Sequence, residues 1–178
     1  MEDLMLRLEL SALQDRYVAC LDNDRIEDWP GLFTEDCLYQ IISKENEDLG
    51  LPAPVIHCDN ARMLRDRVVA LRNANIYEKP LYRHCLSGLT WRQEDEGLYA
   101  METSYVVVNT SPEGTSTIYQ AGRYLDRVVR TPDGLRFRAK RCTPGRRGLM
   151  ALPPPSCGSA WLSEGWLQPP RWHGLSLL

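Results

Sequence analysis

The sequence predicts an α+β protein in which amphipathic helices pack on one face of a curved antiparallel sheet. Apolar residues recur at three- and four-residue steps through the first part of the chain, which predicts helices. Beyond Pro80 the pattern changes to long runs rich in Tyr, Val and Thr that are separated by turn residues, which predicts strands. Helices followed by a run of strands are typical of the α+β class.

Two long helices are expected. The first ends at the helix-stopping run Asp22-Asn23-Asp24. Its apolar stripe is Leu6, Leu10, Leu13, Tyr17 and Leu21. The other begins near Asp59 or Asn60, both good N-cap residues, and ends near 73–75. Its apolar face is Ala61, Leu64, Val68 and Leu71. Its solvated side is Arg62, Arg65, Asp66 and Arg72.

A short helix, a strand and a loop are expected between the two long helices. The helical spacing continues through Ile26, Trp29, Leu32 and Phe33. Pro30 limits this segment to a short helix. Residues 37–42 then have the pattern of a strand, and residues 43–58 are expected to form a loop because Gly and Pro interrupt them.

The second half of the chain is expected to form consecutive antiparallel strands. Turn residues stand at 94–97, 111–114 and 131–134. Strands joined by such short turns are antiparallel neighbours. In the last strand Leu135, Phe137 and Ala139 alternate with a polar set, which predicts one buried and one solvated face. The predicted solvated set is Arg136, Arg138 and Lys140.

The sequence predicts one folded domain over residues 1–153 and an irregular tail over residues 154–178. A chain of 178 residues is long enough for one domain with a sizeable core. The tail is rich in Pro and Trp, and the spacing of its tryptophans fits neither a helical stripe nor a strand alternation. We expect it to pack in extended form on a surface that is already folded.

Composition excludes several classes of function. The net charge is −3 and acidic and basic residues are mixed along the chain, so nucleic acid is not an expected partner. The longest apolar strand run is too short to span a membrane. The N-terminus lacks the pattern of an export signal, so we expect a cytoplasmic protein whose six cysteines are reduced, buried spacers.

Three segments carry a resemblance to a known family. They are WPGLFTEDCLYQI, CDNARMLRDRVVALRNANIY and YRHCLSG, in that order between Trp29 and Gly88. Their order and residue pattern resemble the small (β) subunit of Rieske-type aromatic-ring-hydroxylating oxygenases, over about residues 10–153. The resemblance is to the branch that acts on aromatic carboxylates such as salicylate, terephthalate, anthranilate or benzoate. It implies the cone-shaped fold of nuclear transport factor 2.

The resemblance also implies a structural role. Such subunits form a trimer that supports three catalytic α subunits in an α3β3 assembly used in bacterial breakdown of aromatic compounds. The α subunit of these enzymes carries a Rieske [2Fe–2S] cluster and a mononuclear iron. No cofactor or metal is expected in the β chain itself.

The histidine count agrees with that expectation. A Rieske cluster takes two Cys and two His, and the mononuclear iron takes two His and one carboxylate. Both centres together need four histidines, whereas this chain has His57, His84 and His173. It contains no Cys-x-His followed by Cys-x-x-His, and no GxGxxG, P-loop or GxSxG motif. Any metals of the complex are therefore expected in another chain.

His84 carries the alternative enzymatic hypothesis. Some enzymes with a cone fold, including dehydratases and isomerases, use an interior His or Asp for proton transfer. Asp36, Tyr39 or Tyr124 could serve as its partner. His84 could equally be a hydrogen-bonded core or interface residue. A third hypothesis is a small-ligand binding protein that uses the same cavity without chemistry.

Large aromatic residues are candidates for a partner interface, because aromatic side chains are favoured at interface hot spots. These candidates are Trp29, Tyr77, Tyr82 and Trp91. Trp29 fits the core equally well, since it shares a helical stripe with Phe33. A second candidate surface is the basic set on the long second helix, which could remain solvated or meet acidic groups of a partner. That set is Arg62, Arg65, Arg67 and Arg72.

Overall fold

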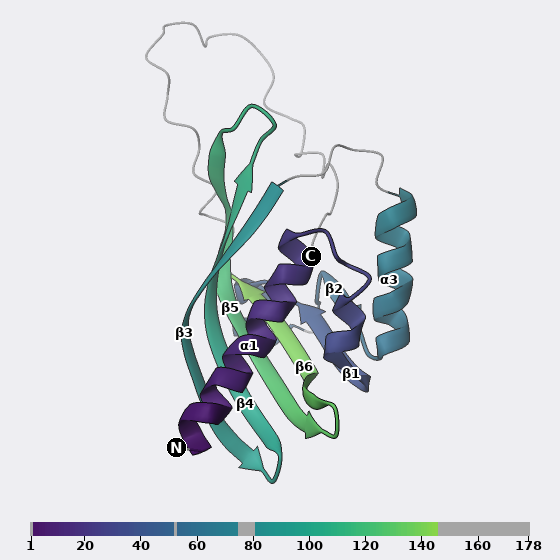
Figure 1. Ribbon diagram of the computed structural model, residues 1–178. Coiled ribbons are helices and arrows are strands. Elements are labelled where there is room, and N and C mark those ends of the chain that lie inside the picture. The colour runs from purple at the N-terminus through teal and green to yellow at the C-terminus, as the bar shows by residue number, and fades with distance from the viewer. Residues whose placement is uncertain (1, 52, 75–80, 146–178) are drawn as a thin grey trace, which may run out of the picture.

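A computed structural model describes residues 2–51, 53–74 and 81–145 (Figure 1). The elements in chain order are α1 (Glu2–Asp22), η1 (Trp29–Leu32), β1 (Phe33–Ile41), α2 (Lys44–Asp48), β2 (Ile56–Cys58), α3 (Ala61–Ala74), β3 (Leu81–Asp95), β4 (Leu98–Thr110), β5 (Ser116–Thr131) and β6 (Gly134–Pro144). The predicted α+β class, with helices first and a meander of strands after them, is confirmed.

The strands form one six-stranded sheet in the order β2-β1-β6-β5-β4-β3. The three hairpins of the meander are antiparallel, as expected. The sheet as a whole is mixed, because β1 lies parallel to β6. Figure 1 shows α1 lying across one face of the sheet and α3 beside β1 and β2. Neither of these helices covers the opposite face.

The two long helices form where the apolar stripes predicted them. In α1 the side chains of Leu10, Leu13 and Tyr17 are buried against the sheet, and Gln14 is buried with them. In α3 the side-chain oxygen of Asn60 accepts a hydrogen bond of 2.9 Å from the backbone N–H of Met63, which caps the helix as expected.

The basic side of α3 makes ion pairs within the chain. The guanidinium of Arg65 lies 3.1 Å from the carboxylate of Glu35 at the start of β1. The guanidinium of Arg72 lies 2.6 Å from both Asp24 and Glu27, in the connection between α1 and η1. Arg65 and Arg72 therefore position α3 against its own chain.

Two predictions between the long helices are wrong. Residues 43–58 are not a continuous loop, because they contain α2 and β2. Ser43 caps α2 by accepting from the backbone N–H of Asn46 at 3.2 Å, and β2 pairs with β1 through its backbone. Phe33 begins β1 instead of continuing the short helix, since η1 ends at Leu32.

The prediction that Lys140 lies on the solvated face of the last strand is also wrong. A β-bulge interrupts the pairing of β5 with β6, where Arg127 lies opposite Ala139 and Val128 lies opposite Phe137. The extra residue, Arg138, shifts the alternation by one position. Leu135 and Phe137 are buried as expected, but beyond the bulge Lys140 points into the core with 1% of its surface exposed.

Four of the five cysteines in the described ranges are buried and free, as expected. Burial raises the pKa of Cys37 and of Cys142 to about 11, so both thiols are protonated near neutral pH. Cys85 departs from the prediction, because it is exposed on strand β3. Cys157 lies outside the described residues.

Candidate functional site

The interior between α1 and the sheet holds a group of polar side chains that we call the interior cluster: Gln14, Thr103, Asp126 and Lys140. The ammonium of Lys140 donates to the Asp126 carboxylate and to the Gln14 amide oxygen, both at 2.9 Å. The Gln14 amide nitrogen donates to Asp126 at 2.8 Å and to Thr103 at 3.2 Å. The Lys140 and Asp126 side chains are both fully shielded from solvent.

Burial dominates the electrostatics of Asp126. It raises the pKa of this carboxyl from 3.8 to about 6, although the Lys140 ammonium and the hydrogen bond from Gln14 oppose the rise. One carboxylate oxygen of Asp126 accepts all of these bonds, and the other, Oδ1, has no hydrogen-bond partner among the described residues. A buried ion pair of this kind is stable only when further hydrogen bonds support it.

Aromatic rings surround the ammonium. The Lys140 nitrogen lies 4.2 Å from the ring centroid of Tyr17, 4.0 Å from that of Tyr124 and 4.4 Å from that of Phe137. These distances are those of cation–π interactions. We call these three rings the ring cage. Burial raises the pKa of Tyr17 and of Tyr124 well above its ordinary value, so both phenols stay neutral.

More aromatic side chains fill the space beside the ring cage. The hydroxyl groups of Tyr17 and Tyr39 share a hydrogen bond of 3.2 Å. The ring of Trp29 packs edge to face on Tyr39, with the centroids 5.1 Å apart, and has no exposed surface. The described interior of the cone is therefore occupied by the protein's own side chains.

His84 does not contact any of its three predicted partners. Its ring nitrogen Nδ1 lies 2.5 Å from the carboxylate of Asp22, the last residue of α1, and its backbone N–H donates to the same carboxylate at 2.9 Å. Asp36 is instead an exposed residue paired with Arg138 at 3.2 Å. Tyr39 and Tyr124 belong to the buried aromatic group.

The contacts of His84 join α1 to an edge strand. The guanidinium of neighbouring Arg83 donates to the backbone oxygen of Asp22 at 2.9 Å, so two consecutive residues of β3 hold the end of the helix. The His84 and Asp22 side chains are 3% and 9% exposed. His84 is therefore a hydrogen-bonded, largely buried side chain that links β3 to the end of α1.

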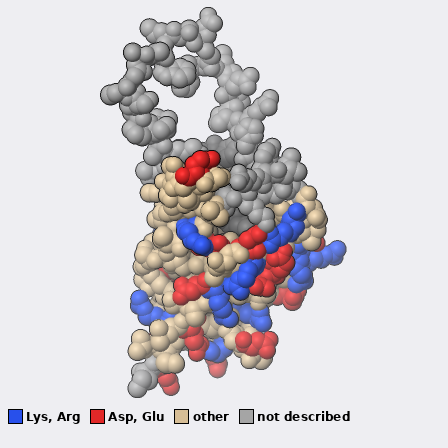
Figure 2. Space-filling model, turned by 45° about the horizontal axis from the view of Figure 1, so that its top comes forward, with Lys and Arg blue, Asp and Glu red and all other residues tan. Residues whose placement is uncertain are grey.

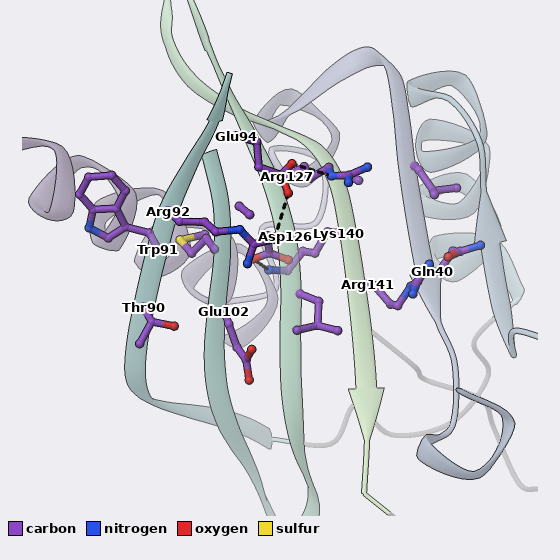
Figure 3. Close-up of a pocket in the computed structure, with 15 residues that line it drawn as sticks. Gln40, Thr90, Trp91, Arg92, Glu94, Glu102, Asp126, Arg127, Lys140 and Arg141 are labelled. Atoms are coloured by element: carbon purple, nitrogen blue, oxygen red, sulfur yellow. Dashed lines mark hydrogen bonds and ion pairs between the residues drawn. The ribbon is translucent and has the colours of Figure 1, made fainter. Parts of the chain in front are cut away.

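The opposite sheet face carries a shallow depression of about 550 Å³ (Figure 3). Its apolar lining includes Leu38, Ala100, Leu125 and Ala139. On its rim the carboxylate of Glu94 pairs with Arg92 at 3.1 Å and with Arg127 at 3.0 Å. Figure 3 shows Thr90, Glu102 and Arg141 on the viewer's side of the strands. Asp126 and Lys140 of the interior cluster also border this depression, although their side chains are fully shielded from solvent.

One end of the sheet extends beyond the helices (Figure 1). We call this region the apolar arm; it consists of 81–85, 104–110 and 116–121. Leu81 and Ile118 are 63% and 65% exposed there, and Tyr119 is 40% exposed. Figure 2 shows charged side chains gathered over the lower part of the visible face, while its upper described part is mainly uncharged. This exposed apolar surface makes the arm a candidate contact site.

The predicted interface residues differ in exposure. Trp29 belongs to the core, as described above. Tyr82 is half-buried on the apolar arm, with its ring centroid 5.1 Å from that of Tyr119. Trp91 is half-buried and packs edge to face on Tyr99 at 6.1 Å. Tyr77 lies outside the described residues.

Sequence reasoning missed Gln14, Asp22 and Asp126. For Gln14 and Asp126 the sequence pattern did indicate a buried position. Gln14 lies within the apolar stripe of α1, one helical turn from Leu10. Asp126 lies between Tyr124 and Val128 at alternate positions of one strand, which places it on their buried face.

Neither a metal centre nor a membrane span is found in the described part of the chain. Within residues 2–51, 53–74 and 81–145, no group of three or more His, Cys, Asp and Glu side chains is placed to hold a metal ion. None of the helices in those ranges is long and apolar enough to cross a membrane.

Comparisons with known proteins agree with this architecture. Residues 2–141 match the SnoaL-like domain. The small subunit of anthranilate 1,2-dioxygenase from Burkholderia cepacia is 58% identical over 140 residues, which cover 79% of this chain and 87% of that protein. Subunit beta 2 of the terminal oxygenase component of terephthalate 1,2-dioxygenase from a Comamonas species is 33% identical over 75% of this chain and 86% of that subunit.

A solved structure is also similar to this chain. It is the beta subunit assigned to an aromatic-ring-hydroxylating dioxygenase of Novosphingobium aromaticivorans. It superposes with a TM-score of 0.76 at 38% sequence identity, over 82% of this chain and 93% of that one.

The fold and its helix-packed interior define a SnoaL-like domain with the cone-shaped architecture of nuclear transport factor 2. Within that class, the chain belongs to the family of small (β) subunits of aromatic-ring-hydroxylating dioxygenases. The resemblance inferred from the sequence is therefore confirmed. The chain is therefore related to subunits of multicomponent dioxygenases, which are oxidoreductases.

Proposed function

We propose that this protein is the non-catalytic structural subunit of a cytoplasmic oxygenase that hydroxylates an aromatic carboxylic acid of the anthranilate type. The observation that carries the proposal is the 58% identity to an anthranilate 1,2-dioxygenase small subunit over 87% of that protein's length. The terephthalate 1,2-dioxygenase subunits are less similar to this chain, and their enzyme acts on another aromatic acid. They therefore support an aromatic carboxylate as the class of substrate.

The proposed partner is a catalytic α subunit that holds a Rieske [2Fe–2S] cluster and a mononuclear iron. Three β chains would associate as a trimer and support three α chains in an α3β3 complex. The three histidines of this sequence support placing both metals in the partner, because the two centres need four. The role of the β trimer would be to hold neighbouring α chains at a fixed distance.

The interior geometry favours this role over the two alternatives. A dehydratase or isomerase needs a proton-transfer group beside a space for substrate. Here His84 is engaged by the end of α1, and aromatic rings together with Lys140 occupy the interior. The same filling of the interior disfavours a protein that binds a small ligand inside the cone.

We propose the apolar arm as a subunit contact surface. Interfaces in permanent complexes are more apolar than the rest of a protein surface. Leu81, Ile118 and Tyr82 would contribute to it, and Trp91 would lie at a second contact further along β3. Tyr77 stays a candidate from the sequence alone.

Co-expression with a catalytic α chain, sought in neighbouring genes by its Cys-x-His…Cys-x-x-His motif, tests the proposal. We expect a complex with equal numbers of both chains by light scattering, and hydroxylation of anthranilate only when both chains are present. Iron and Rieske-type visible absorption should follow the catalytic chain through purification. Stoichiometric iron in this chain alone would contradict the assignment, as would a stable monomer both alone and with the catalytic chain.

A matched pair of variants tests the contact surface. Ile118→Asp puts a charge on the apolar arm and should prevent assembly, whereas Glu113→Gln, in the neighbouring turn, should leave assembly unchanged. Circular dichroism of the isolated variants checks that both remain folded. Full assembly of Ile118→Asp would show that the apolar arm is not part of the subunit interface.

A further inference from the structure

We propose that the interior of the cone is a binding site for a primary alkylammonium ion, which Lys140 fills with its own side chain. A variant in which this side chain is shortened would bind a free alkylammonium ion in its place. The inference rests on the contacts of the Lys140 nitrogen and is independent of the proposed function.

The groups around the Lys140 nitrogen are those that recognise an organic cation. A carboxylate oxygen of Asp126 and an amide oxygen of Gln14 each accept one of its N–H bonds at 2.9 Å. The ring cage presents three aromatic rings at 4.0 to 4.4 Å. Aromatic rings combined with a carboxylate form a receptor for ammonium groups in an enclosed site.

The receptor is held in place by contacts that do not involve Lys140. The amide of Gln14 is fixed by its bonds to Asp126 and Thr103. Tyr17 packs edge to face on Tyr124 with the centroids 5.7 Å apart, and on Phe137 with the centroids 5.8 Å apart. Tyr124 in turn stacks on Tyr105 at 4.2 Å. Shortening Lys140 therefore leaves the walls of the site supported.

The shape of the site specifies its ligand. The atoms of a lysine side chain beyond Cβ correspond to n-propylammonium. In Lys140→Ala this ion can occupy the same volume, donate to the same two oxygens and restore the charge beside Asp126. The alcohol 1-propanol has a similar size but no charge. Tetramethylammonium has the charge but no N–H donor and is bulkier, so it should bind poorly.

Thermal unfolding of Lys140→Ala in a titration with n-propylammonium chloride tests the proposal. We expect a saturable rise of the unfolding midpoint by about 3 °C or more, because a ligand that binds only the folded state stabilises it. Lys140→Met is the matched control, since its side chain fills the volume without the charge. Lys140→Met and the native chain should respond no more than they do to sodium chloride.

Two results would overturn the proposal. One is an equal effect of 1-propanol and n-propylammonium on Lys140→Ala. The other is an equal effect of n-propylammonium on Lys140→Ala and Lys140→Met. In addition, Lys140→Ala/Asp126→Leu should lose the response, because the carboxylate is part of the receptor.

Refolding gives a second measurement if Lys140→Ala does not fold alone. We then expect n-propylammonium, but not 1-propanol, to restore the near-ultraviolet circular dichroism of the native chain. If Lys140→Met folds while n-propylammonium fails to restore Lys140→Ala, the proposal is wrong. None of these results depends on assembly with a catalytic subunit, so they are distinct from the tests of the proposed function.

Discussion

The amide oxygen of Gln14, near the middle of α1, accepts a hydrogen bond of 2.9 Å from the ammonium of Lys140 on β6, 126 positions later in the chain. This contact joins the first helix to the last strand inside the core. Because the same ammonium also binds Asp126 on β5, three elements converge on one charge. In a low-dielectric interior, removal of one member of such a network leaves the others buried and unpaired, which is costly.

The first prediction concerns this ion pair. Lys140→Met should lower the free energy of unfolding by about 3 kcal/mol, because it leaves the Asp126 carboxylate buried without its counter-ion. Lys140→Met/Asp126→Leu should be much less destabilised than the sum of the single variants, since no charge remains inside. Urea unfolding gives the free energy of unfolding of Lys140→Met, Asp126→Leu and the double variant. Arg138→Met, two residues away on the exposed side, should change stability by less than about 1 kcal/mol. Additive effects of the two core changes would contradict the coupling.

The second prediction concerns pH. The folded-state pKa of Asp126, about 6, lies above its ordinary value of 3.8, so the folded chain holds this proton more tightly than the unfolded chain does. The stability from this group is present below about pH 4 and is lost as pH rises through about 6. Lys140→Met removes the charge that lowers this pKa. Its destabilisation should therefore be larger at about pH 8 than at about pH 5 in urea unfolding. An equal cost at both pH values would contradict this.

The third prediction concerns Gly122 on β5. A Cβ atom at this position would lie 2.3 Å from the backbone oxygen of Thr143 and 2.8 Å from the Cα of Pro144, so the neighbouring strand would have to move. We expect Gly122→Ala to destabilise the fold by about 2 kcal/mol or more. Gly31 has no atom within 4 Å of such a Cβ, so Gly31→Ala should be nearly neutral. Thermal unfolding compares the two, and equal midpoints would show that β6 yields at this contact.

The fourth prediction concerns His84. His84→Ala should cost about 1–3 kcal/mol of stability, because the largely buried Asp22 carboxylate loses its partner. His84→Asn keeps a donor near the position of Nδ1 and should recover part of the loss. Turnover by the assembled oxygenase should change little in either variant. A fall of kcat by more than about 100-fold in an intact complex would instead favour general acid–base catalysis by His84.

The fifth prediction concerns the proposed domain boundary. A chain that ends at Pro153 keeps all six strands of the sheet, the last of which ends at Pro144. We expect it to fold with the far-ultraviolet circular dichroism of the intact chain, less any small contribution of residues 154–178. A truncated chain that fails to fold would move the boundary to a later residue.

Periodicity in the sequence was sufficient to predict the helices and the meander, because each depends on contacts close in the chain. The stripe of α1 and the turns of the β hairpins are local patterns of this kind. The parallel pairing of β1 with β6 could not be predicted from either strand alone. It joins Ile41 to Cys142, and nothing local to either residue specifies the other.

The interior cluster could not be predicted from the sequence, because a β-bulge moves Lys140 from the solvated face of β6 to the buried face. Strict alternation along β6 places Lys140 with Arg136 and Arg138, and a lysine is rarely buried without a partner. The bulge at Arg138 is a property of the pairing with β5, not of the β6 sequence. Likewise, Asp22 was assigned as a helix-stopping residue, and its contact with His84 arises only when α1 packs on β3.

The parallel pairing of β1 and β6 also fixes the order in which a growing chain can be completed. Strand β1 is made early, yet its long neighbour in the sheet, β6, is the last of the described strands to leave the ribosome. The hairpins β3–β4 and β4–β5 can form as they emerge, whereas β1 must wait for residues near Cys142 before it pairs with β6. Contacts between segments so distant in the chain slow folding and leave apolar surface exposed in the meantime. The aromatic residues of the core are thus most exposed to solvent, and the chain most prone to aggregate, while the protein is being translated.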